Sequence, residues 1–150
     1  MNPEQLALAS KSFNAMSSIS AASAKYSGSM VKNPAGSGVL VRVNQLTVSH
    51  LHSAALLVSM SDLEQSTFIY TASPRELIVG GSGSPLAGLI GGQEATPAGV
   101  VFRRIFVPNG ESESILVRPI YIKPGSAVSV YLGSPNITSY ITADWDELPI

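Results

Sequence analysis

The sequence predicts an all-β protein: an antiparallel β-sandwich or jelly roll preceded by an N-terminal helix or arm. Seven short runs rich in β-branched residues follow residue 38, and groups of Gly, Pro, Asn and Ser separate them. No helical pattern alternates with these runs, which argues against an α/β design. A length of 150 residues fits one domain. We therefore expect an arm over residues 1–30 and a sandwich over residues 31–150.

The predicted helix occupies the serine-rich N-terminal segment. Asn2 is a suitable cap, Pro3 suits the first helical position, and Glu4 lies at the positive end of the helix dipole. A stripe then recurs every three or four residues, at Leu6, Ala9, Phe13, Met16 and Ser20. Serines are mediocre helix formers, so such a helix must pack against something. Its own domain and a neighbouring subunit are both open as the packing surface, and a disordered segment is the third alternative.

The predicted strands begin where the period changes to two. Val39, Val41 and Val43 alternate with more polar residues, and the run continues through Val48. Further strand-like runs are Ala54–Met60, Thr67–Thr71, Val100–Val107, Ser114–Ile122, Ala127–Leu132 and Ile137–Ala143. Turn residues such as Pro108-Asn109-Gly110 and Lys123-Pro124-Gly125 separate them, as expected for consecutive antiparallel strands.

A glycine-rich segment, Gly80–Gly92, interrupts this pattern with six glycines in thirteen positions. It satisfies neither phosphate-binding glycine motif, and no lysine follows it. We expect a long loop between strands, because glycine usually weakens a strand. Its apolar residues Leu86, Leu89 and Ile90 suggest contact with another chain.

The composition excludes several classes of protein. Nine Lys and Arg face ten Asp and Glu, giving a net charge of −1 without a basic run, so we expect neither a nucleic-acid nor a membrane partner. Cysteine is absent, which removes thiolate metal sites and thiol catalysis. Only 13% of residues are charged, so much of the surface must be weakly polar or apolar. Surfaces of that kind commonly contact other subunits.

Few residues of the sequence are candidates for metal binding or catalysis. His50 and His52 would share one face of a strand and begin a metal site, but no third ligand follows at a recognisable spacing. Asp144 and Asp146 would form at best a weak cation site. No G-x-S-x-G motif presents a serine nucleophile. We therefore expect no catalytic residue, no cofactor and no bound metal, and a cupin-type enzyme based on the two histidines is a distant alternative.

Trp145, the only tryptophan, is either a core residue closing the last strand or an anchor at an interface. The residues we expect at contacts with other chains are Leu6, Phe13, Met16, Leu86, Leu89, Ile90 and Trp145.

Two motifs resemble those found in small virion proteins of tailed bacteriophages. One is the segment Asn33-Pro34-Ala35-Gly36-Ser37-Gly38, which enters a long strand, and the other is the W-x-E pattern of Trp145 and Glu147. The resemblance implies a β-sandwich assembly protein without catalytic residues, located in the virion after assembly in the host cytoplasm.

The leading hypothesis is a capsid decoration or cement protein that binds the major capsid protein or another virion protein. The resemblance further implies a homo-oligomer, with a trimer favoured. Alternatives are a tail, neck or head-fibre component, or a carbohydrate- or receptor-binding sandwich. In the last case exposed tyrosines would stack on sugar rings, the candidates being Tyr70, Tyr121, Tyr131 and Tyr140.

Overall fold

The computed structural model describes residues 11–77 and 83–150, which form two packed antiparallel sheets without any helix. The first sheet contains β1 (Lys11–Ile19), β3 (Val39–His50), β6 (Pro74–Glu76), β9 (Glu113–Ser114), β10 (Ile120–Ile122) and β12 (Ser139–Pro149). The second contains β2 (Tyr26–Asn33), β4 (Leu56–Ser61), β5 (Phe68–Thr71), β7 (Gly88–Glu94), β8 (Val101–Val107) and β11 (Ser126–Leu132). The predicted antiparallel β-sandwich is confirmed.

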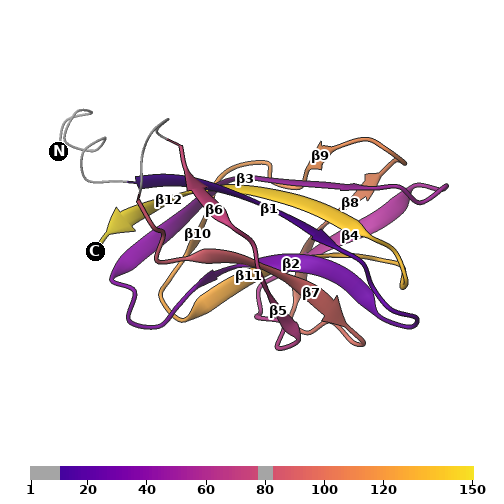
Figure 1. The fold of residues 1–150 in the computed structure, drawn as a ribbon, viewed down its shortest axis with the longest axis horizontal. Helices are drawn as coiled ribbons and strands as arrows, with labels where there is room; N and C mark the ends of the chain where they lie inside the picture. The colour runs from indigo at the N-terminus through magenta and orange to yellow at the C-terminus, as the bar shows by residue number, and fades with distance from the viewer. Residues whose placement is uncertain (1–10, 78–82) are drawn as a thin grey trace.

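The strand order places the last strand in the middle of the first sheet. That order is β10-β3-β12-β1-β6, with β9 beside β3, and the second sheet runs β5-β7-β2-β11-β4-β8. Consecutive strands β2, β3 and β4 alternate between the sheets, and so do β10, β11 and β12. Figure 1 shows β1, β3 and β12 running together in one layer above β2, β7 and β11.

The core lies between the sheets and follows the period-two pattern of the sequence. Inward side chains of β3 and β12, such as Val41, Val43 and Ile141, are fully buried. Trp145 packs beside Phe13, with ring centroids 6.0 Å apart. Aromatic side chains supply large buried areas, so these two rings form the largest single contribution to the core of the first sheet.

A β-bulge interrupts the pairing of β3 with β12. Asp144 pairs with Gln45 and Trp145 pairs with Val43, so Asn44 is the extra residue. The bulge moves the inward face of β3 from odd positions to even positions, from Val43 to Leu46. The sequence carries this signal, because its apolar alternation skips one residue at Asn44-Gln45.

The predicted N-terminal helix is wrong over the residues that the structure describes, since these form β1 and β2. Residues 1–10, including Leu6, lie outside the described residues. In β1 the side chains of Phe13 and Ala15 are buried, whereas Met16 is exposed. Pairing with β12 on one side and β6 on the other decides the conformation, because a serine-rich segment has little helical preference of its own. The sandwich therefore includes residues 11–30.

Residues 80–82 of the glycine-rich segment lie outside the described residues. The predicted loop is wrong over residues 88–92, because residues 88–94 form strand β7 between β5 and β2. Glycine is required there by close packing. A Cβ at Gly91 would lie 2.7 Å from Ile19 of the other sheet, and one at Gly92 would lie 2.6 Å from the Phe68 backbone. The glycines thus allow close approach where we expected them to interrupt the strand.

The remaining predicted strands agree with the structure to within two residues, with two exceptions. The predicted run Ile137–Ala143 is too short, because β12 continues to Pro149. The run Ser114–Ile122 is divided into β9 and β10, and the chain between them leaves the sheet. This irregular segment lies at the open side of the sandwich and helps to form the pocket described below.

Candidate functional site

The motif that begins at Asn33 and ends at Gly38 forms the turn between β2 and β3. Asn33 makes most of its hydrogen bonds. The buried amide nitrogen of Asn33 donates to the carbonyl oxygens of Val39 and Ile122, both at 2.9 Å. Its side-chain oxygen accepts from the Ser37 hydroxyl at 2.6 Å, and its backbone oxygen accepts from the Gly125 N–H at 2.7 Å. Asn33 therefore fastens two turns, one from each half of the chain, at the same end of the sandwich.

The glycines of this motif have a conformational role. Gly36 and Gly38 have φ values of 76° and 74°, in the left-handed region that side chains disfavour. Their conformation lets the chain reverse between β2 and β3 while Ser37 reaches back to Asn33. The motif is explained by turn geometry and internal hydrogen bonds.

The second motif, Trp145 and Glu147, forms a buried polar cluster at the same end of β12. Glu147 is only 5% exposed, and its carboxylate accepts hydrogen bonds from the backbone N–H groups of Leu86 and Ala87. The Trp145 indole also donates to it, at 3.2 Å. Three N–H groups thus stabilise a carboxylate that has no cationic partner within the described residues. The cluster holds the chain before β7 against β12.

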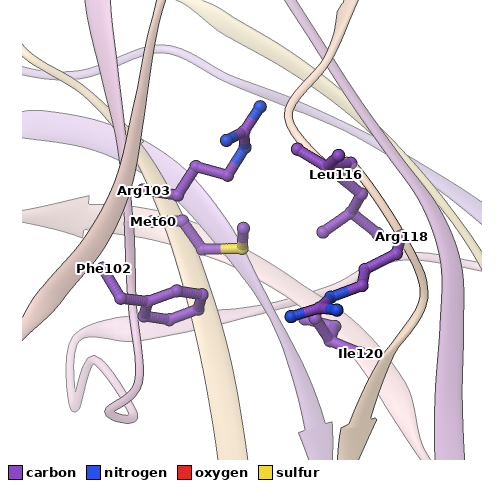
Figure 2. A pocket seen from close by; sticks show the side chains of 7 residues that line it. Met60, Phe102, Arg103, Leu116, Arg118 and Ile120 are labelled. Carbon is purple, nitrogen blue, oxygen red and sulfur yellow. The ribbon is translucent and has the colours of Figure 1, made fainter.

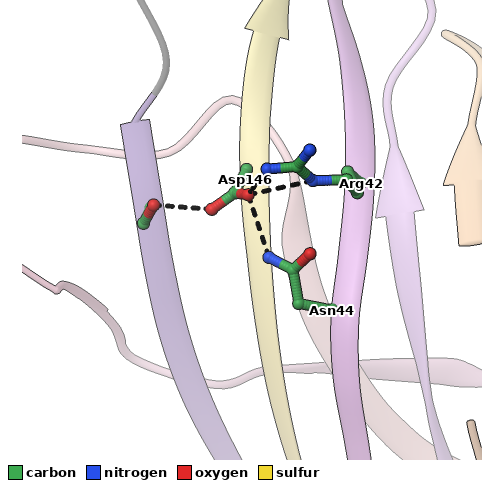
Figure 3. A network of polar contacts seen from close by, with 4 residues as sticks. Arg42, Asn44 and Asp146 are labelled. Carbon is green, nitrogen blue, oxygen red and sulfur yellow. Dashed lines mark hydrogen bonds and ion pairs between the residues drawn. The ribbon is translucent and has the colours of Figure 1, made fainter. Parts of the chain in front are cut away.

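A second network covers the outer face of the first sheet (Figure 3). Asp146 accepts hydrogen bonds from Ser12 of β1, at 2.5 Å, and from Asn44 of β3, at 2.9 Å. Arg42 of β3 donates to the same carboxylate through two nitrogens and forms an ion pair with it. The network joins the three central strands of the sheet across their outer surface.

The ionisation of Asp146 follows from these partners. Burial alone would raise the pKa of its carboxyl, but the hydrogen bonds from Ser12, Asn44 and Arg42 and the Arg42 charge outweigh burial and hold the pKa below its usual range. Asp144 accepts from Asn14 on the neighbouring strand. Both carboxylates considered for a cation site are therefore used in hydrogen bonds within the sheet.

The two histidines are separated by their surroundings. His50 is fully buried, its Nε2 bonds to the Val107 carbonyl oxygen at 2.6 Å, and its Nδ1 accepts from the His52 backbone N–H at 3.1 Å. Both ring nitrogens of His50 are thus engaged, whereas the His52 side chain is exposed. Within residues 11–77 and 83–150, no group of three metal-ligating side chains comes together.

The residues expected at contacts with other chains fall into two groups. Phe13, Leu89 and Trp145 are fully buried within their own domain, so the expectation that they face another chain is corrected. They are core residues because strand alternation points them between the sheets. Met16 and Leu86 are exposed, and Ile90 is partly buried beside Met30 and Phe68 on the outer face of the second sheet.

Several exposed apolar side chains gather instead at β8, the edge strand of the second sheet. Phe106 points outward from β8 and is 70% exposed, whereas Phe102 is the extra residue of a β-bulge in β8 and lies on the side of Met60 and Arg103. Val100 precedes the strand, and Val117 lies on the chain before β10 and is 75% exposed. The strand was predicted from the sequence, but its exposed apolar surface was not. The available signal was the presence of two phenylalanines in Val101–Val107.

A pocket of about 440 Å³ opens between β8 and the irregular segment that connects β9 to β10 (Figure 2). Its apolar lining comes from Met60, Phe102, Leu116, Val117 and Ile120, and its charged lining comes from Arg103 and Arg118. Arg103 crosses the gap between the sheets, because its Nε donates to the Ile115 carbonyl oxygen at 2.5 Å. Arg118 extends into the pocket from the opposite side in Figure 2. We call β8 and this pocket the β8 edge site.

The tyrosines considered for sugar stacking do not form one platform. Tyr121 pairs with Arg42, and Tyr140 pairs with Ser49 on the same strand β3, so the two backbones lie about 20 Å apart along the sheet. Tyr70 and Tyr131 belong to the other sheet, and burial raises the pKa of the Tyr131 hydroxyl, against the opposing effect of Arg104. The stacking surface of several adjacent rings is not present among these residues.

None of the described residues belongs to a helix long and apolar enough to cross a membrane. Searches with the whole chain found no matching family model, no matching curated protein and no matching solved structure.

Proposed function

We propose that this chain is a non-enzymatic structural protein of a phage virion, specifically a capsid decoration or cement protein that binds the major capsid shell. The observation that carries the proposal is the β8 edge site, where exposed Phe102 and Val117 line a pocket beside the free edge of β8 and exposed Phe106 lies further along the same strand. Apolar side chains gathered at one edge of a domain are typical of contact with another protein.

The two motifs that resemble those of phage virion proteins support the same proposal. Asn33 and Glu147 are both buried, and their side chains hold loops of this chain in place through hydrogen bonds with backbone groups. Residues whose work is to fix loops suit an assembly protein, which presents a rigid surface many times on one lattice. Repetition of a modest contact over a shell supplies avidity without a large individual interface.

Proposed partners include further copies of the chain, with a trimer as the assembled unit. Met16 lies on the outer face of the first sheet and Leu86 lies beside the buried Glu147 cluster, and both are exposed. Among the described residues these two are the remaining exposed candidates for contacts between copies, since Phe13, Leu89 and Trp145 are in the core and Ile90 is partly buried. Sedimentation equilibrium of the wild type and of Met16→Ser and Leu86→Ser variants tests this assignment.

Cryo-electron microscopy of particles produced with and without the gene for this chain tests the proposed function. We expect density on the outer surface of the shell that disappears on deletion, together with a lower temperature of capsid disruption. Density lost from the tail or neck would replace the decoration role by another virion role. Complete particles from which the chain is absent in both preparations would contradict a virion role altogether.

A further inference from the structure

The β8 edge site combines a strand that has one unpaired edge with an unusual charge distribution. β8 pairs with β4 on one side and ends the second sheet on the other, so alternate backbone groups face away from the sheet. An exposed edge of this kind accepts an added strand from a partner, whose backbone supplies the missing hydrogen bonds. Phe106 flanks that edge on the outer face, and Phe102, the extra residue of a β-bulge, lies on the pocket side beside Arg103.

Cations predominate at this edge. Arg103 and Arg104 are adjacent in β8, and Arg118 lines the pocket with Arg103. None of the three arginines forms an ion pair within residues 11–77 and 83–150, where the ion pairs are Lys32–Glu64 and Arg42–Asp146. No acidic residue lines the pocket. A partner carboxylate would therefore meet guanidinium groups that have no competing anion in the pocket.

These charges disfavour a second copy of β8 as the added strand. Arg103 and Arg104 lie at the middle of Val101–Val107, so a symmetric antiparallel pairing of two β8 strands sets arginines opposite arginines. Like charges directly opposite each other destabilise a strand pair. The same positions favour a partner strand that carries Asp or Glu.

We propose that the β8 edge site binds an acidic, β-forming peptide segment of another protein, which adds a strand along β8 and places a carboxylate beside Arg103 and Arg118. Apolar side chains on the other face of the added strand lie against Phe106. The inference deepens the proposed function by naming the chemistry of the partner segment, and it rests on that function only for the partner being a virion protein.

Binding of a labelled model peptide to the purified full chain tests the proposal without any phage particle. The probe is fluorescein-labelled Thr-Val-Glu-Val-Glu-Val-Thr, followed by fluorescence anisotropy. One control peptide replaces both glutamates by lysine, and a second replaces the central valine by proline, which removes one backbone donor. We expect saturable binding of the first peptide, weakened by added salt, and neither control peptide should bind comparably.

Protein variants locate the contact. Arg118→Gln should weaken binding of the acidic peptide by about three- to tenfold, because the variant loses the charge that pairs with the peptide carboxylate. The effect is moderate because Arg118 is exposed in the free protein and becomes less solvated when the peptide binds. The matched control is Arg75→Gln, an exposed arginine on β6 at the far edge of the other sheet, which should leave the affinity unchanged. Unchanged thermal unfolding of both variants excludes a loss of fold.

Several results would overturn the inference. They are absence of binding up to about 1 mM acidic peptide, equal binding of the lysine peptide, equal binding of the proline peptide, and equal effects of the Arg118 and Arg75 substitutions. Failure of the proposed function has a different signature, since the peptide would bind to a chain that is absent from particles. Conversely, unchanged attachment of the Arg118→Gln variant to capsids would retain the proposed function and reject this site.

Discussion

At the scale of single residues, the strongest constraints come from buried polar side chains that connect distant parts of the chain. Asn33 joins the turn after β2 to the turn after β10, and Glu147 joins β12 to the chain before β7. A buried donor or acceptor that loses its partner costs more than the bond contributes when made. Substitution of such residues is therefore more informative than substitution of exposed ones.

Replacing Asn33 by alanine should lower the free energy of unfolding by about 2–4 kcal/mol, because the carbonyl oxygens of Val39 and Ile122 lose their buried donor. Urea unfolding followed by circular dichroism measures the change. Asn109→Ala, in an exposed turn, is the matched control and should change the free energy by no more than about 0.5 kcal/mol. Equal effects of the two substitutions would show that the Asn33 amide does not connect the turns.

The carboxyl of Asp146 should make stability depend on pH under acidic conditions. Its pKa is lower in the folded state than its ordinary value of about 3.9, so the unfolded chain binds more protons there. This contribution to stability is present above that ordinary value and is lost as the pH falls through the folded pKa. Urea unfolding at a series of pH values below about 4 should show a shallower loss for Asp146→Asn than for the wild type. The same slope in both proteins would contradict the effect.

At the scale of elements, the sequence predicted strands well where inward residues are β-branched and poorly where they are serine or glycine. Val39, Val41 and Val43 mark β3 clearly. In β1 the inward positions after Phe13 and Ala15 include Ser17, and in β7 they include Gly91, so neither strand shows an apolar alternation. Both strands are fixed by neighbours distant in sequence, which local patterns do not reveal.

The candidate site shows the same division. The composition indicated an assembly surface, but the predicted contacts Phe13, Leu89 and Trp145 are buried because strand pairing turns them inward. The β8 edge site depends on which strand ends the sheet and on a segment 12 to 15 positions further along the chain that faces it. Strand order is a property of the folded chain, so the site was not predictable from spacing alone.

A pair of substitutions in β1 distinguishes the strand from the predicted helix. Phe13 and Met16 would share a face in a helix, but in β1 Phe13 is fully buried and Met16 is 69% exposed. Phe13→Ala should therefore cost about 3–5 kcal/mol of unfolding free energy. Met16→Ala should change the free energy by at most about 0.5 kcal/mol, as measured by urea denaturation. Similar losses for both variants would favour the helical arrangement.

The glycines of β7 provide a second test of an element. Gly92→Ala should destabilise the protein by about 1–3 kcal/mol, because the added Cβ would lie 2.6 Å from the Cα of Phe68 in the paired strand β5. Gly88→Ala, in the same strand, meets nothing within 4 Å and is the matched control. Thermal unfolding compares the two. A stable Gly92→Ala variant would mean that β5 does not lie against β7.

At the scale of the whole molecule, the two sheets share a core and should unfold together. The single tryptophan lies fully buried in β12 at the centre of the first sheet, beside Phe13 of β1. Its fluorescence reports on the first sheet, whereas far-ultraviolet circular dichroism reports on both. We expect the two signals to give coincident urea transitions, as in two-state unfolding of a single domain. Separate midpoints would show that the sheets are independent units.

The central position of β12 also has a consequence for protein synthesis. The ribosome makes Ser139–Pro149 after all the other strands, yet β12 lies between β1 and β3 and hydrogen-bonds to both. Until it emerges, the facing edges of β1 and β3 have no partner on that side, although both strands have already been translated. Unpaired strand edges are open to pairing with other chains. The nascent protein therefore completes its first sheet only after β12 has emerged from the ribosome, and the interval before that is when it most needs protection from aggregation.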